Sequence, residues 1–156
     1  MVKRSVVAAV GLCILAILAG GAAVYAGQSA EARRYFTAPP TATGAQPPFS
    51  AAVLAGGTLY LAGDIGTDAN RKVPDTAEAE AKLVLEKVQA TLQKAGMTMD
   101  DLVSVQIFCS DVKHYDAFNG VYRTYFKKEL PARAFIGVGT LLFNARFEVQ
   151  GIAVKR

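Results

Sequence analysis

The sequence has few of the side chains from which metal and thiol sites are built. Its 156 residues include one histidine, His114, and two cysteines. Cys13 lies in the middle of an N-terminal apolar run, and Cys109 has no histidine or carboxylate pattern around it. We interpret both cysteines as plain apolar residues. These scarcities argue against a cysteine hydrolase or a metal hydrolase.

Charge of either sign is also scarce. The chain has 17 basic and 13 acidic residues, a formal net charge of +4. Removal of Lys3 and Arg4 with an N-terminal segment would leave 15 basic against 13 acidic residues, a net charge of +2. The basic residues form no arginine stripe interleaved with aromatics, so the electrostatic footprint of a nucleic-acid-binding protein is missing. We therefore expect no nucleic-acid partner.

The N-terminus carries a long apolar run. Residues 5–25 are uncharged and follow Lys3 and Arg4, which is the pattern of an export signal. A run of about 20 residues, at about 1.5 Å each, is also long enough to span a bilayer. Val24-Tyr25-Ala26 offers a cleavage site, which favours removal of the segment. We expect residues 1–26 to be a signal peptide or N-terminal membrane anchor. The protein would then be exported, periplasmic or anchored to the membrane by residues 5–25.

A boundary follows this segment. Residues 27–48 are rich in Pro, Ala and Thr and show no strand or helix period, so we expect a linker or arm. The folded domain is expected over residues 49–156. It opens with two apolar runs on either side of Gly56-Gly57, which predict a β-hairpin.

The rest of the domain alternates helical and strand patterns. Apolar residues spaced by three and four predict a helix from Asp75 to Ala95, with Asp75 and Glu78 as a capping box and Gly96 as the stop. The further expected elements are a strand at 102–109, a helix from Asp111 to about Lys127, and strands at 132–138 and 146–154. This order predicts an α+β fold, a mixed β-sheet with two helices packed on one face. The other face then needs a partner or solvent.

Arg133 and Glu148 are the candidate site residues. Each lies inside a strand pattern that should be half buried, and together they supply a group that holds a small anion and a group that steers a water. The same pattern fits a structural ion pair at a subunit interface. Arg146 lies on the same strand face as Glu148 and is an alternative partner for it.

Several segments of the domain resemble the RidA/YjgF family of reactive-intermediate deaminases. The resemblance covers the whole domain and rests on five segments: Leu61-Ala62-Gly63-Asp64-Ile65, Leu92-Gln93-Lys94-Ala95-Gly96, Asn119 to Phe126, Pro131-Ala132-Arg133 and Phe147 to Ala153. The family has a chorismate-mutase-like fold and forms homotrimers with clefts between subunits. The resemblance therefore implies a homotrimer whose sheets face inward.

The resemblance also implies a reaction and a site. The reaction is hydrolysis of 2-imino or enamine acids, such as 2-iminopropanoate and 2-iminobutanoate, to 2-keto acids and ammonia, with no cofactor and no metal. Arg133 would grip the substrate carboxylate, Glu148 would activate the water, and the backbone N–H of Phe135 would add a donor. Asn119, Phe49 and Gly63 match further substrate-binding positions of the family.

The chain departs from the family pattern at three positions. Phe49 stands where a tyrosine is usual, Ala62 where a serine is usual, and Phe135 where a cysteine is frequent. Three polar side chains are therefore absent from the expected cleft. This loss leaves a second class of function open, a non-catalytic trimeric protein, chaperone-like or binding small carboxylates.

Overall fold

The computed structural model describes residues 32–40 and 43–156. All the described helices and strands lie in one compact unit, Arg33–Arg156. The signal or anchor expected over residues 1–26 lies outside the described residues. Among the residues that are described, no helix is long and apolar enough to cross a membrane.

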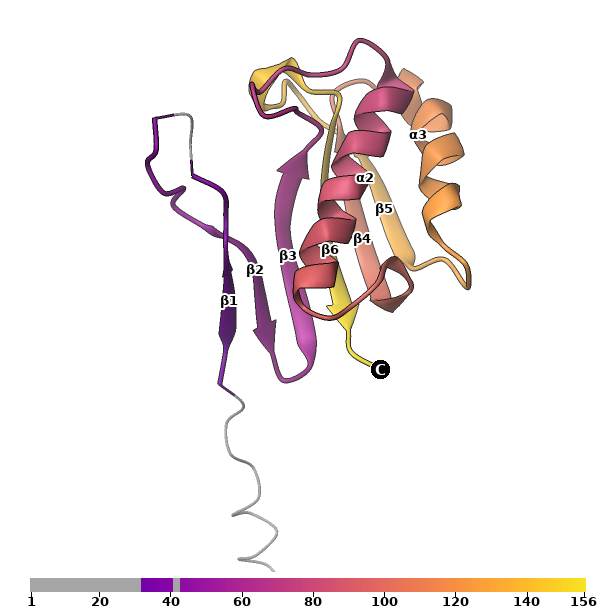
Figure 1. Ribbon diagram of the computed structural model, residues 1–156. Coiled ribbons are helices and arrows are strands. Elements are labelled where there is room, and N and C mark those ends of the chain that lie inside the picture. Colours follow the sequence, from indigo (N-terminus) through magenta and orange to yellow (C-terminus); the bar gives the residue numbers. More distant parts are fainter. Residues whose placement is uncertain (1–31, 41–42) are drawn as a thin grey trace, which may run out of the picture. The chain divides into compact units, whose positions relative to one another are not determined.

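In the described part of the chain, six strands form one mixed sheet (Figure 1). The strands are β1 (Arg34–Thr37), β2 (Ser50–Ala55), β3 (Thr58–Ile65), β4 (Leu102–Cys109), β5 (Ala132–Gly137) and β6 (Phe147–Val154). Their spatial order is β1-β2-β3-β6-β4-β5, and only β4 and β5 pair in parallel. Both long helices lie on one face of this sheet, which confirms the predicted α+β fold.

The folded unit begins earlier than expected. β1 lies within residues 27–48 and pairs antiparallel with β2, Arg34 opposite Leu54. Phe36 is only 7% exposed and joins the core. The guanidinium of Arg34 donates to the carbonyl of Lys94, 3.0 Å away, at the end of a helix. The expectation that residues 27–48 are only a linker or arm is therefore wrong for this segment.

The predicted hairpin is confirmed. β2 and β3 pair with Ala55 opposite Thr58, and the two intervening residues are Gly56 and Gly57. Both have positive φ, 54° and 76°. Two positive φ values are what a tight hairpin turn requires, and glycine adopts them without strain.

The first long helix, α2 (Ala77–Lys94), has a different cap from the one expected. Thr76, not Asp75, is the N-cap, and its hydroxyl accepts a hydrogen bond from the Ala79 N–H at 3.2 Å. Threonine is a good N-cap because its side chain satisfies an amide that has no partner in the helix. Gly96, with φ of 74°, follows the helix as predicted.

The second helix is interrupted. The continuous helix expected from Asp111 to Lys127 consists of a 3₁₀ turn (Val112–His114), the α-helix α3 (Tyr115–Tyr122) and another 3₁₀ turn (Arg123–Tyr125). Asp111 does cap its start, but its carboxylate accepts from the Lys113 N–H at 3.0 Å, which favours a tight first turn. Further 3₁₀ turns cover Met99–Asp101 and Leu142–Asn144.

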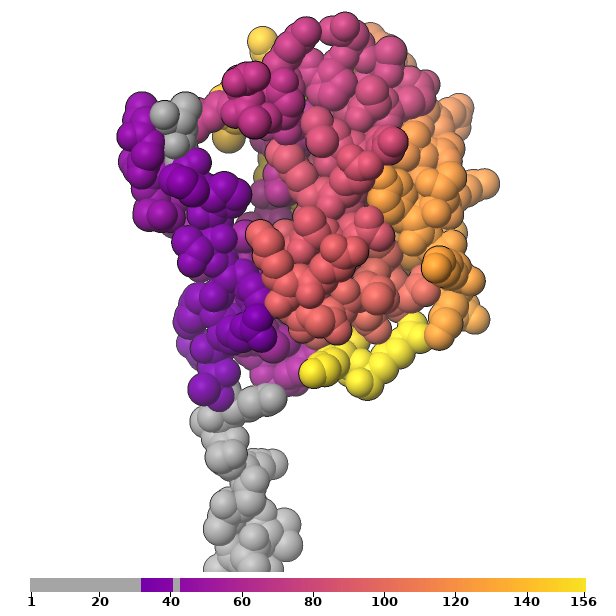
Figure 2. All heavy atoms as spheres, in the orientation of Figure 1, coloured from indigo at the N-terminus to yellow at the C-terminus, as the bar shows by residue number. Residues whose placement is uncertain are grey.

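A bulge changes which side of β4 is buried at its start. The register with β6 shifts between Leu102 and Ser104, so Leu102 is buried and Val103 is 47% exposed. The regular alternation of buried and more exposed residues therefore holds only from Val105 to Cys109. α2 and α3 cover this face of the sheet and lie against each other on the side seen in Figure 2.

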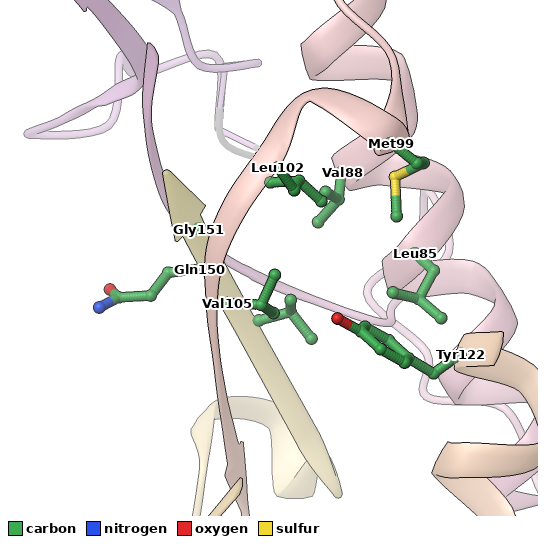
Figure 3. Close-up of a pocket in the computed structure, with 9 residues that line it drawn as sticks. Leu85, Val88, Met99, Leu102, Val105, Tyr122, Gln150 and Gly151 are labelled. Atoms are coloured by element: carbon green, nitrogen blue, oxygen red, sulfur yellow. The ribbon is translucent and has the colours of Figure 1, made fainter. Parts of the chain in front are cut away.

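A packing defect lies in the core beside Tyr122. This void between α2, β4 and β6 is too small for a water molecule and is lined mainly by apolar side chains, Leu85, Val88 and Val105 among them. The Tyr122 hydroxyl points into it (Figure 3) and has no hydrogen-bond partner. Burial raises the pKa of Tyr122 to about 12, and the charge of Arg133 acts in the opposite direction. The phenol therefore stays neutral and unsatisfied.

Candidate functional site

Arg133 and Glu148 lie on opposite faces of the sheet. Arg133 is opposite Val105 in the β4–β5 register, and Val105 packs under the helices. Glu148 is opposite Phe108, while its neighbour Val149 is the residue that enters the core. Since successive strand residues alternate between faces, Arg133 is on the helix side and Glu148 is on the open side. Within one chain the two candidate residues do not form an ion pair.

Arg133 sits in an aromatic cage at the edge of the sheet. Its Nη1 donates to Asn119 Oδ1 at 2.7 Å, and its guanidinium carbon lies 4.9 Å from the ring centre of Tyr122. The rings of Tyr115 and Phe135 are 5.8 and 5.9 Å away. Rings at these distances stabilise a cation. Among the residues that the structure describes, no carboxylate pairs with this half-buried cation.

The cage is built by α3 and β5. Asn119 lies on the buried side of α3, and Tyr115 and Tyr122 lie four and three residues from it, on the same helical face. The ring of Phe135 packs edge-on against Tyr115 at 5.0 Å. Asn119 thus contacts Arg133 and orients it. It is a buried residue of α3, whereas the family resemblance implied a residue of an open cleft.

Glu148 lies on the open face beside Gly63. A β-bulge in β3, between Leu61 and Asp64, brings Gly63 against the carboxylate. A Cβ added at Gly63 would collide with Glu148 Oε1, so only glycine leaves room for the carboxylate in this position. A hollow of about 350 Å³ surrounds it, lined also by Phe108, Gln150 and residues 138–141.

The environment of Glu148 favours its protonated form. Burial raises the pKa of the Glu148 carboxyl above its ordinary value, and the negative charge of Asp64 raises it further. In the described chain Glu148 has no cationic partner. A carboxylate with a raised pKa at a hollow is a candidate for proton transfer.

Arg146 pairs with Glu80 and not with Glu148. Its Nη1 binds Glu80 Oε2 at 2.8 Å, and Glu80 Oε1 accepts from the backbone N–H groups of Arg146 and Phe147 at 2.6 and 2.9 Å. The Glu80 side chain is fully buried. Arg146 therefore anchors the start of β6 to α2 and leaves Glu148 free.

Three further residues of the sequence analysis are Phe49, His114 and Cys109. Phe49 precedes β2 and is 57% exposed. His114 is half-buried, with its ring 6.1 Å from that of Phe147. Cys109 is a buried strand residue, as expected, and burial raises the pKa of its thiol. Within residues 32–40 and 43–156, no group of three His, Cys, Asp or Glu residues could hold a metal ion.

The structure adds residues that the sequence interpretation missed. Tyr115 and Tyr122 lie four and three residues from Asn119, and this helical spacing places them on the same face as Asn119. Gln150 lines the hollow and donates to Gln106 on the adjacent strand. Its position two residues after Glu148 indicated the same face. Figure 3 shows the Gln150 side chain on the other side of the sheet from Tyr122.

The described unit is thus an α+β domain with one mixed sheet. Arg133 lies on the edge strand without a carboxylate partner, and Glu148 lies at a hollow on the open face. Residues 39–155 match the family model described as Endoribonuclease L-PSP. The chain belongs to this family, which is the RidA/YjgF family expected from the sequence.

Named relatives and solved structures agree with this assignment. The chain is 36% identical to a 2-iminobutanoate/2-iminopropanoate deaminase of Dermatophagoides farinae, over 69% of this chain and 85% of the relative. It is 36% identical to the deaminase of the same name from Rattus norvegicus, over 74% and 84%. The crystal structure of yeast Mmf1 superposes with a TM-score of 0.71 at 29% identity, covering 80% of this chain and all of that one. RidA from the Antarctic bacterium Psychrobacter sp. PAMC 21119 gives 0.69 at 26% identity, over 78% and 99%.

Proposed function

We propose that the protein hydrolyses 2-imino acids to 2-keto acids and ammonia. Water adds to the imine carbon, a C–O bond forms, and the C–N bond then breaks. The oxygen of water stays on the keto acid, and its two protons leave on nitrogen, so that a protonated imine yields ammonium. The names of the two deaminase relatives support this reaction class.

The unpaired guanidinium of Arg133 carries the proposal. A half-buried cation without a carboxylate partner is costly unless an anion arrives. The planar fork of arginine matches a carboxylate bidentately, and Asn119 occupies one nitrogen and leaves the others for the ligand. The substrate carboxylate would supply the missing counter-charge.

Glu148 would move the protons. The pKa of Glu148 is raised in the direction of neutral pH. A carboxylate that titrates there can take a proton from the attacking water and return it to the departing nitrogen. General acid–base transfer of this kind contributes about 10²–10⁴-fold. Because water already attacks protonated imines, a sparse site of two charged groups is sufficient.

The two residues require a second copy of the chain. Arg133 and Glu148 face opposite sides of one sheet, so a single chain cannot place both against one small substrate. The open face carries partly exposed apolar side chains, including Tyr60 (51%) and Ile136 (37%), which suits contact with another copy. We propose a homotrimer in which Arg133 of one copy and Glu148 of its neighbour form each of three clefts.

The hollow does not suit the nucleic acid that the family description names. Its one ionisable side chain, Glu148, would repel the phosphate backbone of RNA. A second candidate, a carboxylate-binding protein without turnover, is favoured by the absence of hydroxyl groups at Phe49 and Ala62. An imine-trapping assay separates it from the deaminase.

The test uses the purified protein with an amino-acid oxidase that generates 2-imino acids and semicarbazide that traps the unhydrolysed imine. We expect the protein to reduce the trapped product, and Arg133→Ala to abolish this effect. Arg133→Lys keeps the charge without the fork and should retain only part of it. The matched control is Arg123→Ala, at an exposed arginine outside the cage. A folded wild-type protein that never accelerates imine loss would contradict the deaminase and favour the binding protein.

The shared cleft has its own test. Arg133→Ala and Glu148→Gln should each be inactive, but chains unfolded together and refolded at equal amounts should recover activity. Random association into trimers restores roughly a quarter of the clefts, because each needs an intact residue from each of two neighbours. Absence of recovery in mixed trimers would show that both residues act from one chain.

We also propose that residues 1–26 direct export or anchor the protein in a membrane. The apolar run at 5–25 behind Lys3 and Arg4 supports this. Fractionation of cells expressing the tagged chain should place it outside the cytoplasm or in the membrane fraction, and deletion of residues 1–26 should return it to the cytoplasm. Recovery of the intact chain in the cytoplasmic fraction would contradict the proposal.

A further inference from the structure

Asp64 reaches its position through the bulge in β3. Leu61 pairs with Gly151 and Asp64 with Val149, so three steps along β3 match two along β6. The extra residue reverses the alternation. Asp64 therefore turns to the helix side, where Val149 packs, while Gly63 stays against the Glu148 carboxylate on the open side.

Two contacts hold this carboxylate, and a third holds the lysine that makes one of them. Lys87, on α2, places its Nζ 3.4 Å from Asp64 Oδ1 and 2.8 Å from the Ile65 carbonyl. Asp64 Oδ1 also accepts from the Ile65 N–H at 2.8 Å. Ile65 is the strand partner of Glu148. The negative charge of Asp64 thus lies on the helix side of the sheet, next to Ile65, the strand partner of Glu148.

The other described surroundings of Glu148 carry little charge. β4 presents Phe108, β6 presents Gln150, and the loop contributes residues 138–141, which hold no ionisable side chain. Lys87 lies behind Asp64 on the helix side. In the proposed trimer Arg133 of a neighbouring copy would face Glu148 and favour its ionised form, until the substrate carboxylate neutralises that arginine.

We propose that Asp64 is a positioning residue for the deaminase reaction: its charge, fixed by Lys87 behind the sheet, sets the pH range over which Glu148 takes and returns a proton. The proposal rests on the proposed function. Imine hydrolysis needs Glu148 first as a base toward water and then as an acid toward the departing nitrogen. A carboxyl that protonates close to the working pH serves both steps better than one that is ionised throughout. Asp64 opposes the ionising effect of the neighbouring Arg133 and preserves this dual use.

The test compares Asp64→Asn with Glu86→Gln. Asparagine keeps the oxygen that accepts from the Ile65 N–H and removes only the charge. Glu86 is an exposed carboxylate next to Lys87 in the sequence, paired with Lys82. We expect the acidic limb of the kcat/KM profile to move to lower pH in Asp64→Asn and to stay in place in Glu86→Gln. Lys87→Met should move it to higher pH, because Asp64 then acts uncompensated.

A second readout does not depend on turnover. The side-chain carboxyl of Glu148, observed by ¹³C NMR in protein labelled on glutamate and assigned by its loss in Glu148→Gln, should titrate at lower pH in Asp64→Asn. An unchanged titration and an unchanged acidic limb would overturn the proposal and leave the deaminase standing. If the wild-type protein lacks turnover, the proposed function fails, and the role of Asp64 in catalysis fails with it whatever the titration shows.

Discussion

The buried carboxylate of Glu80 offers a quantitative test of what holds β6 in place. Its three hydrogen bonds join α2 to Arg146 and Phe147, the two residues before Glu148. Glu80→Ala would leave two backbone N–H groups without an acceptor and Arg146 without its counter-charge. Breaking a buried pair in this way costs about 3–5 kcal/mol. The Arg146 side chain is 25% exposed, so water relieves part of the cost and we expect about 3–4 kcal/mol.

This cost translates into a large thermal shift. Unfolding entropy of about 2.1 cal/mol/K per residue, over about 120 residues, gives roughly 0.25 kcal/mol per degree. The Tm should therefore fall by roughly 12–16 °C, measured by circular dichroism at one fixed protein concentration because an oligomer's Tm depends on it. Glu80→Gln keeps an acceptor oxygen and should fall less. The control, Glu78→Ala, removes an exposed carboxylate from the same helical turn and should cost less than about 1 kcal/mol. A Glu80→Ala protein no less stable than this control would refute the reasoning.

Three further substitutions address the void and the hollow. Tyr122→Phe removes a buried hydroxyl without a partner and should raise the free energy of unfolding in urea by about 1 kcal/mol. Tyr125→Phe, which loses a hydrogen bond to the Lys82 carbonyl, should lower it, and equal losses in both variants would contradict this account. Gly63→Ala should displace Glu148 and reduce kcat/KM by about 10²-fold, whereas Gly120→Ala, at a site with open space, should not; full activity in Gly63→Ala would show that the carboxylate has room to move. In an Arg133→Ala background, which removes the neighbouring cation, Glu148→Gln should raise the Tm at pH 7, because the raised pKa makes ionisation of Glu148 unfavourable in the folded state. The gain should shrink as pH falls through the folded pKa and vanish below the unfolded pKa of about 4.3, and a gain that is independent of pH would rule out this cause.

The elements with strong local signals were predictable. Gly56 and Gly57 predict the hairpin because two positive φ values are needed at adjacent positions. The apolar spacing of α2 predicts a helix that covers the sheet. The cap was assigned one residue early because Asp75 and Thr76 are both good N-cap residues, and only the observed bond to the Ala79 N–H distinguishes them.

The elements that depend on distant partners were not predictable. β1 is four residues long, and Phe36 is its one strong apolar signal, so it emerges only through pairing with β2. Arg146 was compared with Glu148, two residues away, although its partner Glu80 lies 66 residues earlier. The family of the chain could be identified, and Arg133 and Glu148 could be selected as candidates. The separation of Arg133 and Glu148 onto opposite faces could not, because facing depends on the register of each strand with its neighbours.

The position of β6 affects how the chain can fold during its synthesis. β6 follows the other five described strands in the sequence, yet it lies between β3 and β4 at the centre of the sheet. While a ribosome still holds β6 inside its exit tunnel, the hairpin side and the β4–β5 side have no strand to join them. Leu59 and Val105, which are buried in the finished core, remain open to chaperones until then. Folding should therefore begin only after release of the segment Phe147–Val154, and a chain stalled before it should be recognised as unfolded.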